Sequence, residues 1–396
     1  MSRIVCVWEL GDDLGHFSNF SPLIEEMLQA NHEVFFLVKD LANSECFSWS
    51  EKIRFFQAPI FLSKIDPIQE VDCFANILQN KGYYSATTLT PLVKAWMALF
   101  SLLQPDLIIF DHAPTALLAS NNLSIPRITL SNGFLTPPAG TAPQNLQPWL
   151  VADQSRMEHS EAHVVEVINK VAINLGLQNI ARISDLYSAR LTCITGFKAI
   201  DFYRSTRTNA LYLSPASKPN SHPKPNWQPN SGKKVFAYLK SHCKTTPILL
   251  DALALLNVNL VCYCAGTKDA AYIKYRGSSV QISNTLFDIN AALAEADIVM
   301  CHAGPGMVNA ALLAGCPMVL IPMQLEQANT SRILEAMGVA ISLKRSDDAN
   351  AITKKLSLFF NNPSYAEQSR LFRQRQCEFS DLIDAQQVWQ LCEALL

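Results

Sequence analysis

The sequence predicts an α/β protein built from two domains, each with a doubly wound parallel sheet. The chain has 396 residues, which is too long for one ordinary hydrophobic core and suits two. In the first half, apolar runs alternate with helical stretches, an order that is typical of parallel strands joined by crossover helices. A proline-rich break follows, and the same alternation then begins again.

The first domain is predicted over residues 1–214. Short apolar runs predict buried strands, whereas apolar residues three and four positions apart predict helices. The predicted strands are 3–8, 32–38, 52–57, 106–111 and 126–131, and the predicted helices are 20–31, 90–104 and 114–123. Because proline interrupts helical hydrogen bonding, we expect the helix at 90–104 to end before Pro105.

A linker and a second domain follow. Residues 215–232 are rich in proline and poor in apolar side chains, which predicts a linker. The second domain is predicted over 233–375. Its predicted strands are 234–239, 259–266, 279–283, 297–303, 317–322 and 339–343. Its predicted helices are 246–257, 287–296, 306–315 and 327–338. The tail at 376–396 has helical periodicity. In such sheets, ligands bind outside the carboxyl ends of the strands.

Composition argues against several classes of protein. The chain has 32 Lys and Arg against 34 Asp and Glu, so we expect no nucleic-acid partner. The N-terminal apolar run is too short for a signal peptide, and no stretch reaches the roughly 18 uncharged apolar residues of a membrane span. The eleven cysteines form no CxxC pair, which favours buried reduced thiols over a zinc site. These features predict a cytoplasmic protein without a transmembrane segment.

The segment 297–340 carries the strongest functional signal. A strand expected to end at Cys301 is followed by His302, a Gly-Pro-Gly turn and a helix that begins near Met307. Backbone N–H groups at a helix start lack partners and carry the positive end of the helix dipole, so this corner can bind a diphosphate without a basic side chain. Glu326 and Gln327 follow the next strand, at the same edge of the sheet. For the Gly-Pro-Gly turn alone, an ordinary tight turn remains an equal alternative.

The whole ordered set resembles the donor-binding signature of GT-B glycosyltransferases that use nucleotide sugars, a class that includes bacterial macrolide and plant flavonoid enzymes. The matching residues are His302, Gly304, Gly306, Gly315, Pro317, Pro322 and Gln327, with Glu326 in place of an aspartate. The resemblance implies two Rossmann-like domains facing a cleft, with the final helix crossing back to the first domain.

The resemblance also implies a role for each part of this signature. His302, Gly304, Gly306 and Met307 would hold the donor diphosphate, and Glu326 and Gln327 would bind sugar hydroxyls. Two residues depart from the pattern. Met307 stands where the family has a Ser or Thr that contacts phosphate, and Ala310 stands where it has a ribose-binding Glu. Donor affinity or nucleotide choice can therefore differ from the family norm.

The loop after the first strand contains Gly15 and His16, with Pro22 six residues after the histidine. The same family has a Gly-His at this place and an Asp after a later buried strand, a position that Asp111 occupies here. The resemblance implies that His16 is the general base for an acceptor hydroxyl and that Asp111 orients its ring. Both follow strands of one predicted sheet, so we expect them to lie close together. We interpret His112 as a loop neighbour rather than a second base.

Acceptors in this fold bind to the first domain, and the segments 61–86 and 132–150 are the candidates here. Tyr83, Phe134 and Trp149 could line an apolar acceptor pocket, with ordinary core packing as the alternative.

These features together predict an inverting glycosyltransferase that moves a sugar from a UDP or dTDP sugar to a hydroxyl of a small, partly apolar acceptor. The nucleotide sugar is a co-substrate, and no other cofactor and no metal are expected, because a helix N-terminus can offset the charge of the leaving diphosphate. Asp12 and Asp13 are interpreted as loop residues rather than metal ligands.

A nucleotide-sugar epimerase or hydrolase of the same fold and a non-catalytic binding homologue remain alternatives, and a homo-oligomer remains open. A dehydrogenase is disfavoured, because the loop at 11–16 lacks the spaced glycines of a dinucleotide site.

Overall fold

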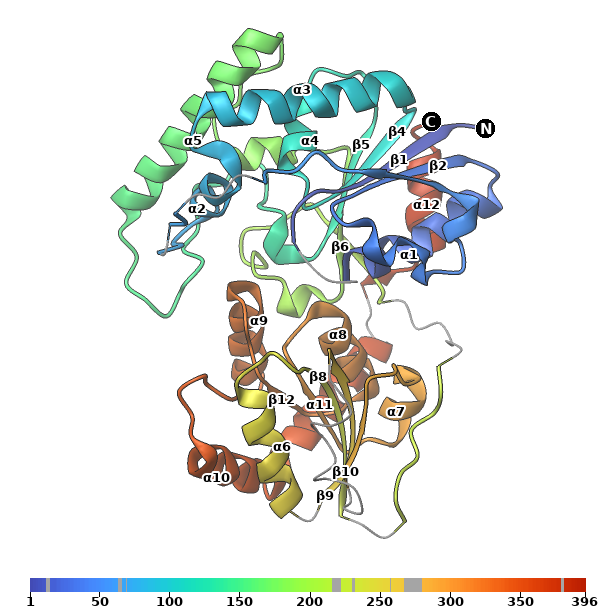
Figure 1. The fold of residues 1–396 in the computed structure, drawn as a ribbon, viewed down its shortest axis with the longest axis vertical. Coiled ribbons are helices and arrows are strands. Elements are labelled where there is room, and N and C mark those ends of the chain that lie inside the picture. Colours follow the sequence, from blue (N-terminus) through green and yellow to red (C-terminus); the bar gives the residue numbers. More distant parts are fainter. Residues whose placement is uncertain are drawn as a thin grey trace. The chain divides into compact units, whose positions relative to one another are not determined.

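The computed structural model describes residues 1–11, 15–62, 66–68, 70–215, 222–229, 232–256, 258–266, 280–378 and 381–396. These residues divide into two compact units. The first comprises Met1–Ser214 with Leu382–Leu396, and the second comprises Pro215–Asp381. Each unit contains one sheet in which the paired strands run parallel, with helices on its faces (Figure 1). The predicted α/β class with two parallel sheets is confirmed.

The first unit has an eight-stranded sheet with the order β14-β7-β6-β5-β4-β1-β2-β3. Its strands are β1 (Arg3–Trp8), β2 (Glu33–Val38), β3 (Arg54–Gln57), β4 (Leu107–Asp111), β5 (Arg127–Ser131), β6 (Leu191–Thr195), β7 (Leu211–Leu213) and β14 (Leu382–Ile383). Its helices are α1 (Gly15–Gln29), α2 (Phe74–Leu78), α3 (Ala86–Leu103), α4 (Pro114–Ala119), α5 (Gln154–Leu175) and α12 (Ala385–Glu393). Shorter helical turns include η4 (Gly133–Leu135), η5 (Ile183–Tyr187) and η6 (Lys198–Ile200).

Both faces of the first sheet are covered, which is why its central strands are apolar along their whole length. In β1, Val5 and Val7 belong to the core beneath α2, α3, α4 and α5. Ile4 and Cys6 belong to the opposite core, beneath α1 and α12. The order of β1, β4 and β2 in the sheet places the loops after β1 and β4 side by side at one edge.

The C-terminal tail differs from the single helix expected over 376–396. Helix α11 (Ser364–Glu378) belongs to the second unit and ends at Glu378. The chain then forms β14, which pairs with β7, before Asp384 caps α12 through a hydrogen bond from the Gln387 backbone N–H. Helix α12 packs against α1 in the first unit. The apolar pair Leu382–Ile383 thus extends the first sheet instead of continuing a helix.

The second unit has a six-stranded sheet with the order β10-β9-β8-β11-β12-β13. Its strands are β8 (Lys233–Lys240), β9 (Val258–Ala265), β10 (Val280–Ser283), β11 (Ile298–Cys301), β12 (Met318–Leu320) and β13 (Ala340–Ser342). Its helices are α6 (Thr245–Leu255), α7 (Ile289–Glu295), α8 (Pro305–Ala314), α9 (Leu325–Ala336), α10 (Ala349–Phe360) and α11. The ten cysteines that the structure describes with their side chains are free thiols, and all but Cys377 are buried.

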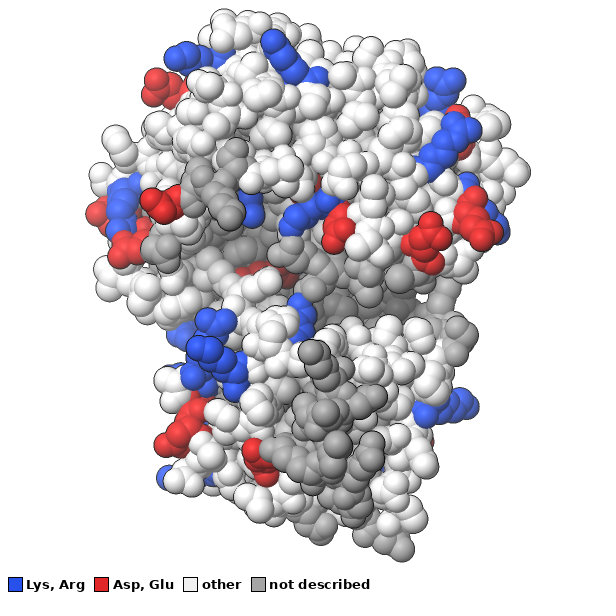
Figure 2. All heavy atoms as spheres, in the orientation of Figure 1, with Lys and Arg blue, Asp and Glu red and all other residues white. Residues whose placement is uncertain are grey.

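Helix α3 is the one helix among the described residues whose length and apolar composition would suffice to cross a membrane. One side of it is buried in the first core through Leu89, Val93, Trp96, Phe100 and Leu103. It also contacts α4 and α5. Packing in the first unit therefore accounts for the apolar residues on that side of α3. On the face shown in Figure 2, charged side chains form small scattered groups, several of them with basic and acidic residues side by side, and wide uncharged areas lie between the groups.

Candidate functional site

The loops after β1 and β4 bring His16 and Asp111 together. The two strands are parallel neighbours, with Trp8 opposite Asp111 in the ladder. Helix α1 begins at Gly15, so His16 lies in its first turn. The His16 Nδ1 atom lies 2.8 Å from Asp111 Oδ2, and the Asp111 side chain is fully buried. The structure therefore joins the two residues that the sequence placed at one edge of the sheet.

Three neighbours that the sequence did not single out fix this pair. The Trp8 indole stacks on the His16 ring, with centroids 4.9 Å apart and planes 16° apart. Asn19, one helical turn after His16, donates to Asp111 Oδ2 at 3.1 Å. Gly11 has a positive φ of 96°, and a Cβ there would overlap His16 Nε2. Because a carboxylate only accepts hydrogen bonds, Nδ1 carries the proton and Nε2 is the basic nitrogen.

A second buried carboxylate lies beside the pair. Glu9 follows β1 and accepts hydrogen bonds from the backbone N–H groups of Thr115 (2.9 Å) and Ala116 (3.2 Å) in the first turn of α4. Its burial raises its pKa to about 7, and the hydrogen bonds offset only part of that rise. Glu9 therefore titrates near neutral pH inside the first unit.

The raised pKa of Glu9 gives a testable pH dependence. Between pH 4.5 and 7 the folded chain binds more protons at Glu9 than the unfolded chain, so stability falls as pH rises through this window. In the wild type, titration of Glu9 is expected to lower the free energy of unfolding by about 2–3 kcal/mol between pH 5 and pH 8. We expect this contribution to be absent in Glu9→Gln. Urea unfolding at both pH values measures it, with Glu166→Gln on the exposed side of α5 as the control. An unchanged pH slope in Glu9→Gln would contradict the assignment.

In the second unit, His302 links three strand ends. It follows β11, whose neighbours in the sheet are β8 and β12. His302 Nδ1 donates to the Ile321 carbonyl (2.8 Å), and Nε2 accepts from the Lys240 backbone N–H (2.9 Å). The ring thereby fixes the loops after β8, β11 and β12. A phosphate contact from the His302 ring, as the resemblance implies, would require one of these bonds to break.

The start of α8 presents backbone amides next to His302. Gly304 is the N-cap, Pro305 is the first helical residue, and Gly306 is exposed. A Cβ on either glycine would meet no atom within 4 Å, so the space at this helix start is open. Met307 is 8% exposed, so it buries its side chain and offers its backbone N–H. Methionine at position 307 therefore removes the hydroxyl that a Ser or Thr would offer, but the backbone N–H groups of the helix start are still present.

Glu326 and Gln327 lie in the first turn of α9, beyond the carboxyl end of β12. Both are half-buried. The Gln327 Oε1 atom accepts a hydrogen bond from the Met323 backbone N–H at 2.8 Å, which ties the helix start to the preceding loop. The second unit therefore gathers His302, the α8 amides and the start of α9 at one edge of its sheet.

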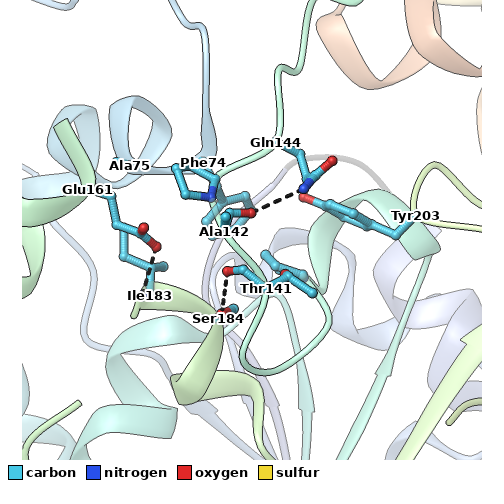
Figure 3. Close-up of a pocket in the computed structure, with 11 residues that line it drawn as sticks. Phe74, Ala75, Thr141, Ala142, Gln144, Glu161, Ile183, Ser184 and Tyr203 are labelled. Atoms are coloured by element: carbon cyan, nitrogen blue, oxygen red, sulfur yellow. Dashed lines mark hydrogen bonds between the residues drawn. The ribbon is translucent and has the colours of Figure 1, made fainter. Parts of the chain in front are cut away.

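The first unit contains a pocket of about 310 Å³ of empty volume, open solvent at its mouth included. Both segments proposed for the acceptor contribute to it, and Figure 3 shows α2, the loop after η4 and η5 around it. Phe74 and Tyr203 are its aromatic walls, and Gln144 and Glu161 are among its polar groups. Glu161 accepts from the Ile183 N–H (3.2 Å), and burial raises the pKa of its carboxyl.

None of the three aromatic residues predicted for the acceptor lines this pocket. Tyr83 is fully buried, with its hydroxyl 2.8 Å from the Thr115 hydroxyl. Phe134 is buried edge-on against Phe202, and Trp149 is half-buried. The two segments therefore contribute to the pocket through residues other than these three aromatic side chains.

A buried ion pair holds the loop that forms one side of the pocket. The Arg207 Nε atom lies 2.6 Å from Asp201 Oδ2, and neither side chain is more than 2% exposed. Arg207 Nη2 donates to the carbonyl oxygens of Gly133 and Thr136, each at 2.8 Å. The Arg207 guanidinium also lies 5.5 Å from the centre of the Tyr203 ring. The Arg207 guanidinium thus connects Tyr203, which lines the pocket, with Gly133 and Thr136 at the start of the loop after η4.

Among the residues that the structure describes, no group of three or more His, Cys, Asp or Glu side chains could hold a metal ion. Asp12 and Asp13, interpreted above as loop residues, lie outside the described residues.

Comparison with known proteins gives matches to both parts of the chain. Residues 252–384 match the family model described as glycosyltransferase family 28 C-terminal domain. The UDP-N-acetylglucosamine--N-acetylmuramyl-(pentapeptide) pyrophosphoryl-undecaprenol N-acetylglucosamine transferase of Shewanella oneidensis is 31% identical over 136 residues, which is 33% of this chain and only 37% of that relative. The zeaxanthin glucosyltransferase of Pseudescherichia vulneris is 22% identical over 83% of this chain and 84% of its own length. The crystal structure of the glycosyltransferase VinC in complex with dTDP superposes with a TM-score of 0.71 at 16% identity, over 99% of each chain.

Proposed function

We propose that this chain, whose fold is that of GT-B glycosyltransferases, is an inverting glycosyltransferase of the UDP-glycosyltransferase-like class. It transfers a sugar from a nucleotide diphosphate sugar to a hydroxyl group of a small, partly apolar acceptor. The observation that carries the proposal is the His16–Asp111 pair, buried at the carboxyl edge of the first sheet and stacked on Trp8. Such a pair supplies a general base to a hydroxyl nucleophile.

The proposed reaction is a single displacement at the anomeric carbon. His16 Nε2 takes the proton of the acceptor hydroxyl while the acceptor oxygen bonds to the anomeric carbon. The bond from that carbon to the diphosphate oxygen breaks, and its electron pair leaves with the nucleotide diphosphate. Asp111 keeps the proton on Nδ1 and stabilises the imidazolium that forms. One displacement inverts the configuration of the sugar.

The donor diphosphate is proposed to bind at the start of α8. The N–H groups of Gly306 and Met307 have no carbonyl partner within the helix, and the helix dipole favours an anion there. Glu326 and Gln327 are proposed to bind sugar hydroxyls, and His302 to hold the surrounding loops in place. The dTDP complex of VinC and the UDP sugar in the name of the Shewanella oneidensis relative support a UDP or dTDP type of donor.

The acceptor is proposed to enter the pocket lined by Phe74 and Tyr203. Its lining combines apolar side chains with a few polar groups, which suits a molecule with an apolar body and a hydroxyl. The name of the zeaxanthin glucosyltransferase supports an acceptor of this kind. We further propose that the enzyme is cytoplasmic and requires no metal, since the start of α8 offsets the charge of the leaving diphosphate.

Donor binding tests the proposal most directly. Because a Cβ at Gly306 meets no atom, a side chain can be added there without a clash. We expect Gly306→Glu to weaken UDP binding at least about 10-fold by placing a carboxylate beside the diphosphate. Gly306→Gln has the same shape without the charge and is expected to bind UDP more tightly than Gly306→Glu. Calorimetric titration with UDP, dTDP and GDP measures these affinities.

Transfer itself is tested by incubating the wild-type chain with UDP-glucose or a dTDP sugar and a panel of hydroxylated acceptors, followed by mass spectrometry. A glycosylated product with inverted configuration is the expected result, with or without a chelator. Release of free sugar or of an epimer, followed by NMR without acceptor, would instead identify a hydrolase or an epimerase. A chain that binds none of the three nucleotides would overturn the proposal.

A further inference from the structure

His112 is a buried histidine for which the proposed reaction has no use. It directly follows Asp111 and is 7% exposed. Neither of its ring nitrogens has a hydrogen-bond partner among the residues that the structure describes. A buried imidazole without hydrogen-bond partners lowers the free energy of unfolding, so His112 does not contribute to stability through its ring nitrogens.

The backbone of His112 has a structural role that its side chain does not share. The Leu10 N–H donates to the His112 carbonyl at 3.0 Å, which ties the loop before His16 to the loop after β4. The residue adopts a left-handed conformation with φ of 43°, which histidine and asparagine tolerate better than most residues. This bond explains the conformation of the main chain. It leaves the choice of an imidazole unexplained.

The surroundings of the His112 ring connect the reacting pair with the pocket. Asp111 directly precedes His112 in the chain and bonds to His16. The His112 ring centroid lies 6.3 Å from that of Phe74, which lines the pocket, whereas His112 itself does not line it. Burial, and next the charge of His16, lower the pKa of His112 to about 3. A neutral imidazole offers one N–H donor and one nitrogen acceptor.

We propose that His112 binds the acceptor, forming a hydrogen bond with a polar atom next to the hydroxyl that reacts. This inference rests on the proposed function and deepens it, because it adds a polar recognition group beside Phe74, which lines the pocket, and next to Asp111 in the chain. The acceptor class it predicts has an apolar body and at least two neighbouring polar atoms, the reacting hydroxyl and a second oxygen. The acceptor thereby supplies a hydrogen-bond partner that the His112 imidazole lacks among the described residues.

Binding of a model acceptor without donor tests this assignment. The probe is quercetin, a polyhydroxylated aromatic with neighbouring oxygens, titrated into the full chain and followed by fluorescence. We expect His112→Phe, which keeps a ring but removes both nitrogens, to bind the probe about 10-fold more weakly than wild type. His112→Asn suits the left-handed backbone and keeps a shorter polar group, so an intermediate affinity is expected. His159→Phe, the same change at an exposed position of α5, is the control and should bind as wild type does.

The melting temperature separates this role from a structural one. If His112 serves the acceptor, its two variants lose probe affinity without a matching loss of melting temperature, because no protein partner is left unpaired. Should His112→Phe fail to fold, weaker binding by His112→Asn decides the matter. Wild-type affinity in both variants, or no binding of quercetin to the wild-type chain, overturns the inference. Because no donor is present, these results are independent of the UDP titration that tests the proposed function.

Discussion

His16→Asn is expected to lower the turnover number for sugar transfer by about 10²–10⁴-fold while leaving UDP affinity nearly unchanged. The asparagine side chain cannot accept the proton of the acceptor hydroxyl, whereas the proposed donor site lies on α8 of the other unit. Initial rates at saturating donor and acceptor, together with a calorimetric titration of UDP, measure the two quantities separately. The melting temperature of the variant shows whether the first unit stays folded.

Two companion variants make this result specific. Asp111→Asn retains the shape of the side chain but removes the carboxylate that holds the proton on Nδ1, so a loss of similar size is expected. His159→Asn, at an exposed histidine on α5, should transfer sugar at the wild-type rate. If His16→Asn turned over like wild type, His16 would not be the base, and the stacking on Trp8 would need a purely structural explanation.

Arg207→Met is expected to lower the free energy of unfolding of the first unit by about 3–5 kcal/mol. Methionine fills much of the volume but leaves the buried Asp201 carboxylate without its cation, although the Tyr203 N–H and the Tyr212 hydroxyl still donate to it. The carbonyls of Gly133 and Thr136 lose the Arg207 donor. Because the loop after η4 forms one side of the pocket, acceptor affinity is expected to fall as well. Urea unfolding monitored by fluorescence measures the loss of stability.

The matched control is Arg204→Met, an exposed arginine three residues earlier, for which a change below about 1 kcal/mol is expected. A double variant, Arg207→Met with Asp201→Leu, removes both charges and should be more stable than Arg207→Met alone, because no carboxylate remains buried without a counter-ion. Equal stability of Arg207→Met and wild type would show that the ion pair contributes nothing to the fold.

Much of the architecture could be predicted from the sequence because its signals are local. Every strand in the segments 3–131 and 233–343 coincides with an apolar run, and α4 and α8 each begin shortly after such a run. The proximity of His16 and Asp111 followed from the same logic, since both leave parallel strands at one edge. Helix α5 was missed because its sequence is rich in charged and polar residues and its buried side is formed by a few scattered residues, Met157, Val164, Ile168 and Val171 among them.

The remaining features depend on contacts between distant residues. Gly11 matters because a Cβ there would meet the ring of His16, and no local pattern reveals that approach. The hydrogen bonds of His302 to Lys240 and Ile321 join residues 62 and 19 positions away. Asn19 is different, because its spacing of three from His16 on one helix could have identified it. Burial of Tyr83 could not be read from an aromatic residue in a polar segment.

The return of residues 382–396 to the first unit has a consequence for biosynthesis. Strand β14 and the buried residues Val388, Trp389 and Cys392 complete a sheet and a core that otherwise consist of residues 1–214. A ribosome makes residues 382–396 only after the whole second unit has been made. The unit translated first is therefore the last to close, and until residues 382–396 have been made its apolar face beside α1 stays uncovered.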